Sequence, residues 1–323
     1  MSSNVKEVLL VGTGYMGREY VKVLKAQNVS FTVVGNSAAS TQRFSEETSV
    51  PAWAGGIERW FADHPKDHPR LAIVAVQADY AANVVLAMLP HGFDRMMVEK
   101  PCGLTEEETR KISELAECMN TKVLVAYNRR FYASVLAAEK IIAKDNGVTS
   151  FCFELTERSF DPQTQDVGGW FIGNDTHVAD LAFFLGGQPE TLFSIAHNTC
   201  GADKPNDQVA FAGCGVTKKQ AMFSYQANWF APGRWSVEMM TKANRLIFRP
   251  METLQIQKMG SFAIEKVEIE DELDRLYKPG LFLETKEFLE SPENPRFLTI
   301  QEQAEHMKCY FQMLRGNREQ GRG

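Results

Sequence analysis

A lysine at the end of an apolar run is the residue of this chain best suited to proton transfer. Residues 95–98 read as a strand, and Glu99-Lys100-Pro101 follows it directly. A lysine that loses part of its hydration has a lowered pKa and can relay the proton of a substrate hydroxyl. Glu99 could instead hold the lysine charged, and Pro101 fixes the turn. We predict that Lys100 is catalytic; the alternative is a solvated lysine in a surface turn.

His177 is a second candidate for proton transfer. An imidazole changes charge near physiological pH, which suits general acid/base work or a hydrogen bond to a substrate hydroxyl. His177 stands near the start of a helix predicted over residues 176–185. The alternative is a helix N-terminal histidine that the backbone satisfies. Asp180 lies three residues on, on the same helix face, where it would orient His177 or complement the helix N-terminus.

The glycine motif at residues 12–17 (GTGYMG) predicts a dinucleotide site beside this chemistry. It lies between an apolar strand over residues 7–11 and a helix, which is the context that the dinucleotide fingerprint requires. Gly12 would permit a tight turn, Gly14 would let the backbone approach a pyrophosphate, and Gly17 would allow close helix–strand packing. The free N–H groups at the helix N-terminus would then bind the pyrophosphate.

The end of the second predicted strand, residues 30–34, favours NADP over NAD. NAD-preferring folds place an acid there to bind the ribose 2′-OH, whereas this chain has Gly35-Asn36-Ser37. A carboxylate would repel a 2′-phosphate, and these residues leave room for one; Arg43 is a further possible partner. The alternative is an NAD site that binds the ribose through Asn36 alone. The predicted cofactor residues are Gly12, Thr13, Gly14, Tyr15, Met16, Gly17, Asn36, Ser37, Gln77, Glu99 and Lys100.

The elements that must position these residues change character along the chain. Up to residue 125, apolar strands alternate with helices, and a capping box (Thr105 with Glu108) opens one of the helices. This alternation predicts an N-terminal doubly wound parallel sheet, the Rossmann architecture. From about residue 148, short strand candidates follow one another with few helices, which predicts an open, mostly antiparallel sheet with flanking helices. We therefore place an NAD(P)-binding domain at residues 1–125 and a substrate-binding and dimerisation α+β domain at residues 126–323.

Composition excludes several other classes of protein. The chain has 323 residues, 44% of them hydrophobic, and a formal net charge of −6, which argues against a role that depends on neutralising nucleic-acid phosphates. No apolar run is long enough to span a membrane, and the N-terminus lacks a signal-peptide core. The six cysteines are scattered, which favours free thiols in the cytoplasm. Ligand spacing predicts no metal site.

Taken together, these motifs resemble the glucose–fructose oxidoreductase / inositol dehydrogenase (Gfo/Idh/MocA-like) family. Five stretches occur in the order typical of that family: the glycine motif, Glu99-Lys100-Pro101 with Leu104-Thr105, residues 127–131 (YNRRF), Gly168-Gly169-Trp170, and His177 with Asp180. The resemblance spans essentially the whole chain. It implies a cis peptide before Pro101 and pairing of subunits through the open sheet face, hence a homodimer or homotetramer.

The resemblance also suggests which residues contact the substrate. Asn128 and Arg129 would reach the substrate or the cofactor amide at the domain junction, and an arginine there suits a carboxylate or phosphate, although a salt bridge is an equal alternative. Trp170 could stack on a sugar ring, although tryptophan is more often core. Asn174 completes an Asn-x-Thr-His variant of the family motif. The predicted substrate residues are Asn128, Arg129, Trp170, Asn174 and Asp180.

One departure from the family pattern bears on the chemistry. The family often has an aspartate four residues before the histidine, where this chain has Gly173. The sequence therefore predicts an NAD(P)-dependent oxidoreductase that moves a hydride to or from a carbinol carbon of a sugar, sugar nucleotide or polyol. Two alternatives stay open: a reductase of imines or conjugated double bonds, which the missing acid favours, and a non-catalytic NADP-binding sensor.

Overall fold

The computed structural model describes residues 7–65, 68–156, 166–197, 210–229 and 231–316. The chain divides into two compact units. Unit 1 is Met1–Asn128 with Leu273–Met307, and unit 2 is Arg129–Glu272 with Lys308–Gly323. The first crossing between the units, at residue 128, lies close to the predicted boundary at 125. The return of residues 273–307 to unit 1 was not predicted, because the sequence division gave everything after residue 125 to the second domain.

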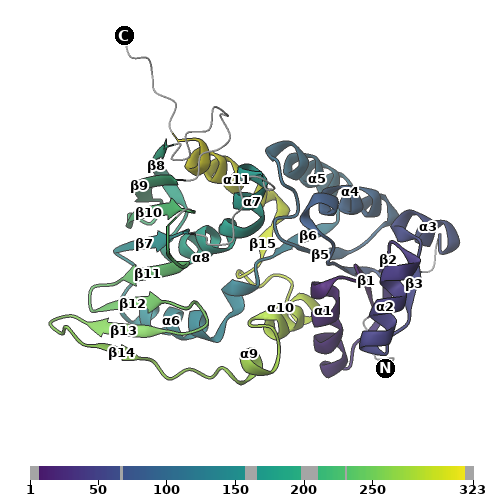
Figure 1. Cartoon of the computed structure of the whole chain (residues 1–323), viewed down its shortest axis with the longest axis horizontal. Helices are drawn as coiled ribbons and strands as arrows, with labels where there is room; N and C mark the ends of the chain where they lie inside the picture. Colours follow the sequence, from purple (N-terminus) through teal and green to yellow (C-terminus); the bar gives the residue numbers. More distant parts are fainter. Residues whose placement is uncertain (1–6, 66–67, 157–165, 198–209, 230, 317–323) are drawn as a thin grey trace, which may run out of the picture. The chain divides into compact units, whose positions relative to one another are not determined.

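Unit 1 is built on a parallel sheet with the strand order of a dinucleotide-binding fold (Figure 1). The order is β15-β6-β5-β4-β1-β2-β3, and β15 alone is antiparallel to its neighbour. The strands are β1 (Glu7–Val11), β2 (Ser30–Gly35), β3 (Ala52–Ala54), β4 (Leu71–Val74), β5 (Arg95–Glu99), β6 (Lys122–Ala126) and β15 (Leu298–Thr299). The predicted doubly wound sheet is confirmed; β3 and β15 were not predicted.

Helices connect the strands of unit 1. They are α1 (Tyr15–Ala26), α2 (Ala38–Thr48), α3 (Gly56–Asp63), α4 (Ala78–Met88), η1 (Leu89–His91), α5 (Glu106–Cys118), α9 (Glu272–Leu276), α10 (Leu281–Glu290) and α11 (Ile300–Arg315), whose last residues belong to unit 2. The predicted capping box is present: Thr105 accepts from the Glu108 N–H at 3.1 Å, and Glu108 accepts from the Thr105 N–H at 3.2 Å. These two bonds fix the start of α5 just after the turn that carries Lys100.

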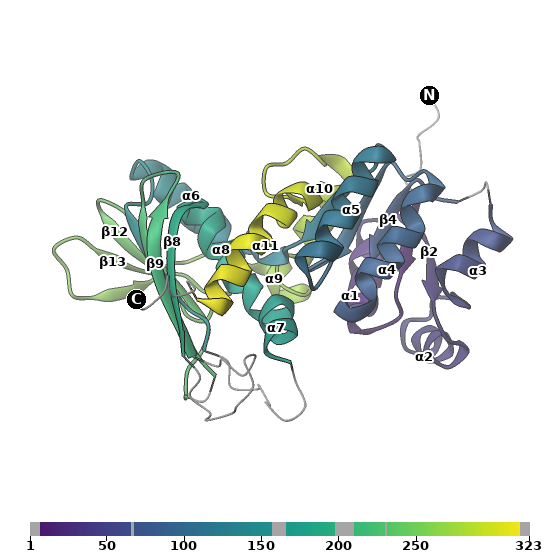
Figure 2. The same cartoon turned by 90° about the horizontal axis from the view of Figure 1, so that it is seen from above.

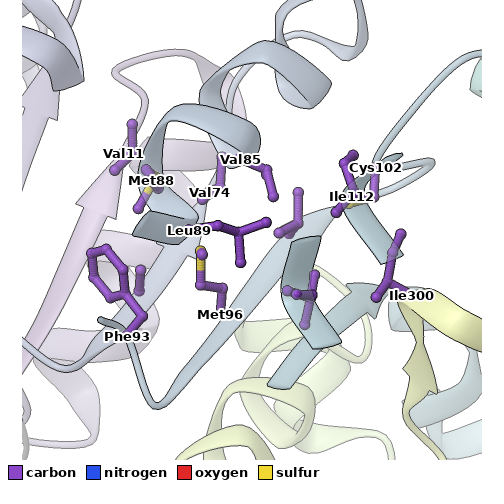
Figure 3. Close-up of a cluster of buried hydrophobic side chains, with 14 of the residues drawn as sticks. Val11, Val74, Val85, Met88, Leu89, Phe93, Met96, Cys102, Ile112 and Ile300 are labelled. Atoms are coloured by element: carbon purple, nitrogen blue, oxygen red, sulfur yellow. The ribbon is translucent and has the colours of Figure 1, made fainter. Parts of the chain in front are cut away.

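The core of unit 1 anchors that turn. Figure 3 shows Val74 of β4 and Met96 of β5 packed with Val85 and Leu89, and it shows Cys102 beside Ile112 of α5. Cys102 lies two residues after Lys100 and is fully buried. Burial raises the pKa of its thiol to about 12, so the side chain behaves as a small apolar anchor. The catalytic candidate is therefore held between a buried strand and a buried side chain.

Unit 2 is built on an eight-stranded sheet in the order β14-β13-β12-β11-β7-β10-β9-β8. Neighbouring strands are antiparallel except β7 and β10, which are parallel, so the predicted mostly antiparallel sheet is confirmed. The strands are β7 (Ser150–Glu154), β8 (Pro189–His197), β9 (Ala210–Thr217), β10 (Met222–Asn228), β11 (Ser236–Met240), β12 (Asn244–Phe248), β13 (Gln255–Lys258) and β14 (Ile264–Lys266). The helices are η2 (Asn128–Phe131), α6 (Ala133–Lys144), α7 (Val167–Trp170), the π-helical turn η3 (Phe171–Asp175) and α8 (Thr176–Gly186).

The two faces of this sheet differ, as the alternation of buried and exposed residues along β10 requires. Helix α8 covers one face (Figure 2), where the ring of Phe183 meets Phe151, Phe153 and Phe223 edge-on at 5.3–6.1 Å between centroids. The other face carries exposed large apolar side chains: Phe193, Ile195 and Met222. In the described part of the chain, no helix is long and apolar enough to span a membrane.

Candidate active site

The three glycines of the loop after β1 each have the geometry that their predicted roles require. Gly12 has φ +121°, and a Cβ there would lie 2.3 Å from the carbonyl oxygen of Ala75. A Cβ on Gly17 would lie 2.1 Å from the carbonyl oxygen of Gly12, so only glycine lets α1 pack this closely. A Cβ on Gly14 would meet nothing within 4 Å, which leaves open space above the backbone at this position.

The N-terminus of α1 fits a bound phosphate. Gly14 is the N-cap, no side chain caps the helix, and the first turn contains no acid. Backbone N–H groups at such a helix end are ready-made anion donors. Thr13 and Met16 are half-buried, whereas Tyr15 is 58% exposed with the Lys278 ammonium 5.4 Å from its ring centroid. The residues at this loop therefore fit the pyrophosphate of a dinucleotide, and Tyr15 and Lys278 flank it.

The end of β2 has no negative charge. Gly35 is buried, and a Cβ there would lie 2.5 Å from Thr41 and 2.7 Å from Thr13, so a larger residue is excluded. Asn36 and Ser37 are exposed, and the Ser37 hydroxyl caps α2 by accepting from the Ser40 N–H at 3.2 Å. The first turn of α2 contains no acid. The site predicted for the ribose is therefore an uncharged helix N-terminus.

Lys100 lies at the edge of the sheet that also carries the glycine loop. It follows β5 and is half-buried, and its peptide bond to Pro101 is cis, as the resemblance implied. Strand β4 alone separates β5 from β1, and all three run parallel, so their carboxyl ends share one edge. Gln77, the exposed N-cap of α4, follows β4 at the same edge.

Glu99 contacts the helix that follows the glycine loop. Its Oε1 accepts a hydrogen bond from the Tyr20 hydroxyl of α1 at 3.0 Å. Burial raises the pKa of Glu99, against the opposing effects of Lys100, the Tyr20 hydrogen bond and Lys278. Burial, together with the carboxylates of Glu99 and Glu284, also raises the pKa of Tyr20 well above its usual value. The sequence did not indicate this contact, because 79 residues separate the two positions.

His177 lies in a continuous helical segment of unit 2 formed by α7, η3 and α8. It is half-buried at the second position of α8. Asp180, three residues on, is 1% exposed, and both of its carboxylate oxygens accept from the Arg130 guanidinium, at 2.5 and 2.8 Å. This pairing was not predicted: Asp180 was expected to orient His177 or complement the helix N-terminus. The carboxylate thus holds η2 to α8.

The position of the family's usual acid is empty space here. Gly173 lies in the π-helical turn, and a Cβ there would meet nothing within 4 Å. Asp175, two residues before His177, is fully buried and accepts from the indole N–H groups of Trp229 and Trp235 at 2.9 and 3.0 Å. Asn174 and Trp170 are half-buried on the same segment.

Asn128 and Arg129, which follow β6, have different surroundings. The Asn128 amide nitrogen is committed to the carbonyl of Pro279 at 2.9 Å within unit 1. The Arg129 guanidinium, in unit 2, lies 4.7 Å from the ring centroid of Trp235 and 3.8 Å from the sulfur of Met251. Trp235 was not among the predicted site residues, and no local signal links it to a residue 106 positions earlier.

The predicted site residues thus fall into two sets. Unit 1 brings together the glycine loop, Asn36 and Ser37, Gln77, Glu99, Lys100 and Asn128 on one sheet. Unit 2 holds Arg129, Trp170, Asn174, His177 and Asp180 on η2 and on the α7–α8 segment. Five cysteines are free thiols, as predicted (Cys102, Cys118, Cys152, Cys214 and Cys309), and Cys200 lies outside the described residues. Among the described residues, no group of histidine, cysteine or acidic side chains is arranged to hold a metal ion.

Comparison with known proteins agrees with this architecture. Residues 6–127 match the model of the oxidoreductase family with an NAD-binding Rossmann fold. The rhizopine catabolism protein MocA of Rhizobium meliloti is 25% identical over 240 residues, which cover 69% of this chain and 72% of that protein. Unit 1 therefore has an NAD-binding Rossmann fold.

Solved structures share the fold of both units. UDP-N-acetylglucosamine 3-dehydrogenase from Acidithiobacillus ferrooxidans superposes with a TM-score of 0.74 at 15% identity, covering 95% of this chain and 96% of that one. Levoglucosan dehydrogenase in complex with NADH and levoglucosan gives a TM-score of 0.76 at 17% identity, with the same coverage. At these identities the likeness concerns the fold alone.

Proposed function

This chain belongs to the Gfo/Idh/MocA family of oxidoreductases, and we propose that it moves a hydride between a nicotinamide cofactor and a carbinol carbon of a sugar, sugar nucleotide or polyol. One observation carries the proposal. The glycine loop and Lys100 follow two strands whose carboxyl ends share one edge of a parallel sheet, with a single strand between them. Ligands of such sheets bind at that edge.

The residues of unit 1 would hold the cofactor in a defined order. The N–H groups at the start of α1 would bind the pyrophosphate in the open space above Gly14. Asn36 and Ser37 would contact the adenosine ribose, and Gln77 and Tyr15 lie at the same edge of the sheet. When bound, the cofactor supplies the hydride acceptor for oxidation or the hydride donor for reduction.

Lys100 would handle the proton. As the carbinol C–H bond breaks and its electron pair leaves with the hydride, the O–H bond also breaks and a C=O bond forms. The hydroxyl proton passes to the Lys100 Nζ, which must be neutral to accept it, and the lysine returns the proton in the reverse reaction. Burial of Cys102 behind the turn keeps the lysine in place during this transfer.

His177 would assist from unit 2 by hydrogen bonding to a substrate hydroxyl. Asp180, three residues on, is bound by Arg130. Trp170 and Asn174, which lie half-buried on the same helical segment, would line the substrate side. The names of the relatives, which concern a rhizopine, a UDP-amino sugar and levoglucosan, support a sugar-like substrate class.

We propose NADP as the preferred cofactor. The support is the uncharged N-terminus of α2, where Ser37 and Ser40 offer hydroxyls and no acid stands in the first turn. Arg43 is exposed one helical turn further on. A 2′-phosphate would be accepted there, whereas a carboxylate would repel it.

The first experiment is a pair of tryptophan-fluorescence titrations of the apo protein with NADPH and NADH. Tighter binding of NADPH supports the preference, equal or reversed affinities refute it, and binding of neither undermines the oxidoreductase proposal. Turnover of a sugar and polyol panel is then compared between wild type and Lys100→Ala, with Lys111→Ala on exposed α5 as the matched control. We expect Lys100→Ala alone to lower turnover by about two to four orders of magnitude, with little change in cofactor affinity.

Gly173 favours a second candidate, a reductase of imines or conjugated double bonds. Relatives that oxidise carbinols often have an acid at this position, and this chain has open space. Turnover of a cyclic imine, with none of any sugar or polyol, would identify this activity. Cofactor binding without turnover of either substrate class would instead point to a sensor.

We further propose that the chain acts as a homodimer or homotetramer through the open face of the unit 2 sheet. Phe193, Ile195 and Met222 are 52–66% exposed on that face, and exposed apolar side chains gathered on one surface commonly mark an interface. Sedimentation of the wild type against Phe193→Glu tests this proposal. A wild-type monomer would contradict it.

A further inference from the structure

We propose that Arg129 anchors a carboxylate of the substrate, and that Trp235 and Asp175 hold its guanidinium in place. The inference rests on the function proposed above, because it narrows the substrate class to sugar-like compounds that carry one carboxylate. It is argued from four residues of unit 2, which we call the Arg129 cluster: Arg129, Trp235, Asp175 and Trp229.

The guanidinium of Arg129 is held by weak, non-ionic contacts. It lies over the indole of Trp235, 4.7 Å from the ring centroid, and one nitrogen contacts the sulfur of Met251 at 3.8 Å. Both contacts orient the planar group without neutralising it. Within the described part of the chain, Arg129 makes no ion pair. A half-buried guanidinium that is oriented but not neutralised is suited to bind an anion.

Trp235 is itself fixed by a buried carboxylate. Its indole N–H donates to Asp175 Oδ1 at 3.0 Å, and the indole N–H of Trp229 donates to Oδ2 of the same carboxylate at 2.9 Å. Asp175 is fully buried, so it cannot swing toward solvent. Donation from an indole N–H to a carboxylate also adds electron density to the ring, which strengthens its attraction for a cation on its face. Asp175 therefore acts on Arg129 through Trp235.

The neighbouring arginine shows what a structural role looks like here. Arg130 is 4% exposed and is bound through two nitrogens by Asp180. Arg129 is half-exposed and contacts a sulfur where Arg130 binds a carboxylate. Both guanidinium groups lie over an aromatic ring, that of Trp235 for Arg129 and that of Phe184 for Arg130. The two adjacent arginines thus differ in one partner: Arg130 binds a carboxylate of the protein, and we infer that Arg129 binds a carboxylate of the substrate. A single guanidinium binds a carboxylate bidentately and matches its single charge, whereas a phosphate dianion calls for more positive charge.

The position of Arg129 in the chain links the cluster to the proposed chemistry. Ala126, the last residue of β6, pairs with Glu99 of β5, next to Lys100. Arg129 follows Ala126 by three residues. Arg129 therefore stands three residues after the strand that pairs with β5, the strand that ends just before Lys100.

Calorimetric titration of the cofactor-loaded full chain tests the anchor. The probes are gluco-, galacto- and manno-hexoses, each as the neutral sugar, the uronate and the 6-phosphate, together with gluconate. We expect at least one carboxylate to bind about 10- to 100-fold more tightly than its neutral counterpart. Arg129→Gln should abolish that preference. Arg129→Lys keeps the positive charge but cannot donate two parallel hydrogen bonds, so it should retain only part of the preference.

The matched control is Arg315→Gln in the same unit, whose guanidinium lies 4.7 Å from the ring centroid of Phe311. It removes a similar cation–π contact and should leave the carboxylate preference unchanged. Equal affinity for acids and neutral sugars, tighter binding of the phosphates, or binding of no probe would each overturn the proposal. Circular dichroism of each variant confirms that it folds.

The role of Trp235 in positioning Arg129 is tested by measuring KM and kcat separately. Trp235→Phe keeps an aromatic face but loses the donor to Asp175, so KM for the acid should rise about 3-fold with kcat unchanged. Trp235→Leu should raise KM about as much as Arg129→Gln. A fall in kcat with constant KM would overturn positioning. If acids bind but no hydride is transferred, the proposed function is refuted and the role of Arg129 as a carboxylate anchor stands. If neutral sugars are turned over and Arg129→Gln does not change that turnover, the proposed function stands and the anchor is refuted.

Discussion

The glycine loop of unit 1 and the Arg129 cluster of unit 2 are built from opposite kinds of contact. The loop depends on backbone geometry at three glycines that lie within six residues of sequence. Gly12 leaves room for the Ala75 carbonyl, Gly17 leaves room for the Gly12 carbonyl, and Gly14 borders open space. The Arg129 cluster depends on side chains that come from three separate segments, at residues 129, 175 and 229–235. A local site can be read from spacing, whereas a site of distant side chains requires the fold.

Breaking a distant contact should have the largest effect on stability. Arg130 and Asp180 are 50 residues apart, almost fully buried, and bound through two hydrogen bonds. Asp180→Asn leaves a buried guanidinium without its carboxylate, so the free energy of unfolding should fall by about 3–5 kcal/mol. Urea denaturation followed by circular dichroism measures the loss.

The control is Glu265→Gln, which removes the exposed pair between Lys258 and Glu265 in the same unit. Exposed pairs contribute little, so its stability should match that of the wild type. If the wild type, Asp180→Asn and Glu265→Gln had equal free energies of unfolding, the buried pair between Arg130 and Asp180 would contribute no more to stability than an exposed pair.

Adding one methyl group to the local site should have the next largest effect. Gly12→Ala forces a non-glycine residue to φ +121° with its Cβ 2.3 Å from a backbone oxygen. Strain and overlap should cost about 2–4 kcal/mol of folding stability. Gly14→Ala is the matched variant: its Cβ meets nothing, so the melting temperature should stay unchanged while affinity for NADPH falls. Identical melting temperatures for the two variants would contradict the assigned roles.

The same division explains how much could be predicted from the sequence. Most elements of unit 1 were predicted because each strand is an apolar run that ends at a turn signal, and the capping box at Thr105 is a local pattern. Strand β3 was missed because three residues give no periodicity, and α3 follows it. The strand over residues 189–197 was also missed. Elsewhere in the same sheet, β7 and β10 pair in parallel, whereas mostly antiparallel neighbours were expected.

The candidate site divides in the same way. The backbone geometry of the glycine loop, the uncharged end of β2 and the cis peptide of Lys100 agree with what spacing and resemblance indicated, while cofactor binding by these residues stays a prediction. The partners of Asp180, Asp175 and Glu99 could not be predicted, because each lies 50 or more residues away. Nor could the return of residues 273–307 to unit 1, since no composition change marks it.

A charge change in the local loop sharpens the comparison without disturbing the fold. Asn36→Asp adds a carboxylate at the exposed end of β2. Its repulsion of a 2′-phosphate should weaken NADPH binding about 10-fold, which corresponds to ~1.4 kcal/mol, and leave NADH binding unchanged or improved. Gln42→Glu, an equal charge change on exposed α2, is the control. Parallel losses in both variants would indicate a general charge effect instead of contact at Asn36.

The smallest expected effect concerns Glu99, which combines both kinds of contact. It is next to Lys100 in sequence, and it accepts a hydrogen bond from Tyr20, which lies 79 residues earlier in the chain. Burial raises its pKa, so the folded state binds a proton that the unfolded state has already released. Wild-type stability should therefore fall as the pH rises from the ordinary carboxyl pKa through the raised one. Glu99→Gln cannot ionise and still accepts from Tyr20, so its stability relative to wild type should increase from pH 4 to pH 7.

Glu107→Gln serves as the control of opposite sign. Hydrogen bonds from Arg110 and Lys111 lower the pKa of that exposed carboxyl, so it stabilises the fold above the ordinary pKa and loses this contribution in acid. Its replacement should lower stability slightly at pH 7 and leave it unchanged at low pH, the reverse of Glu99→Gln. Thermal unfolding of both variants across this pH range separates the two. Parallel pH profiles for the two variants would mean that Glu99 is not buried against Tyr20. Glu99 would then depend only on residues close to it in sequence, as the glycine motif does.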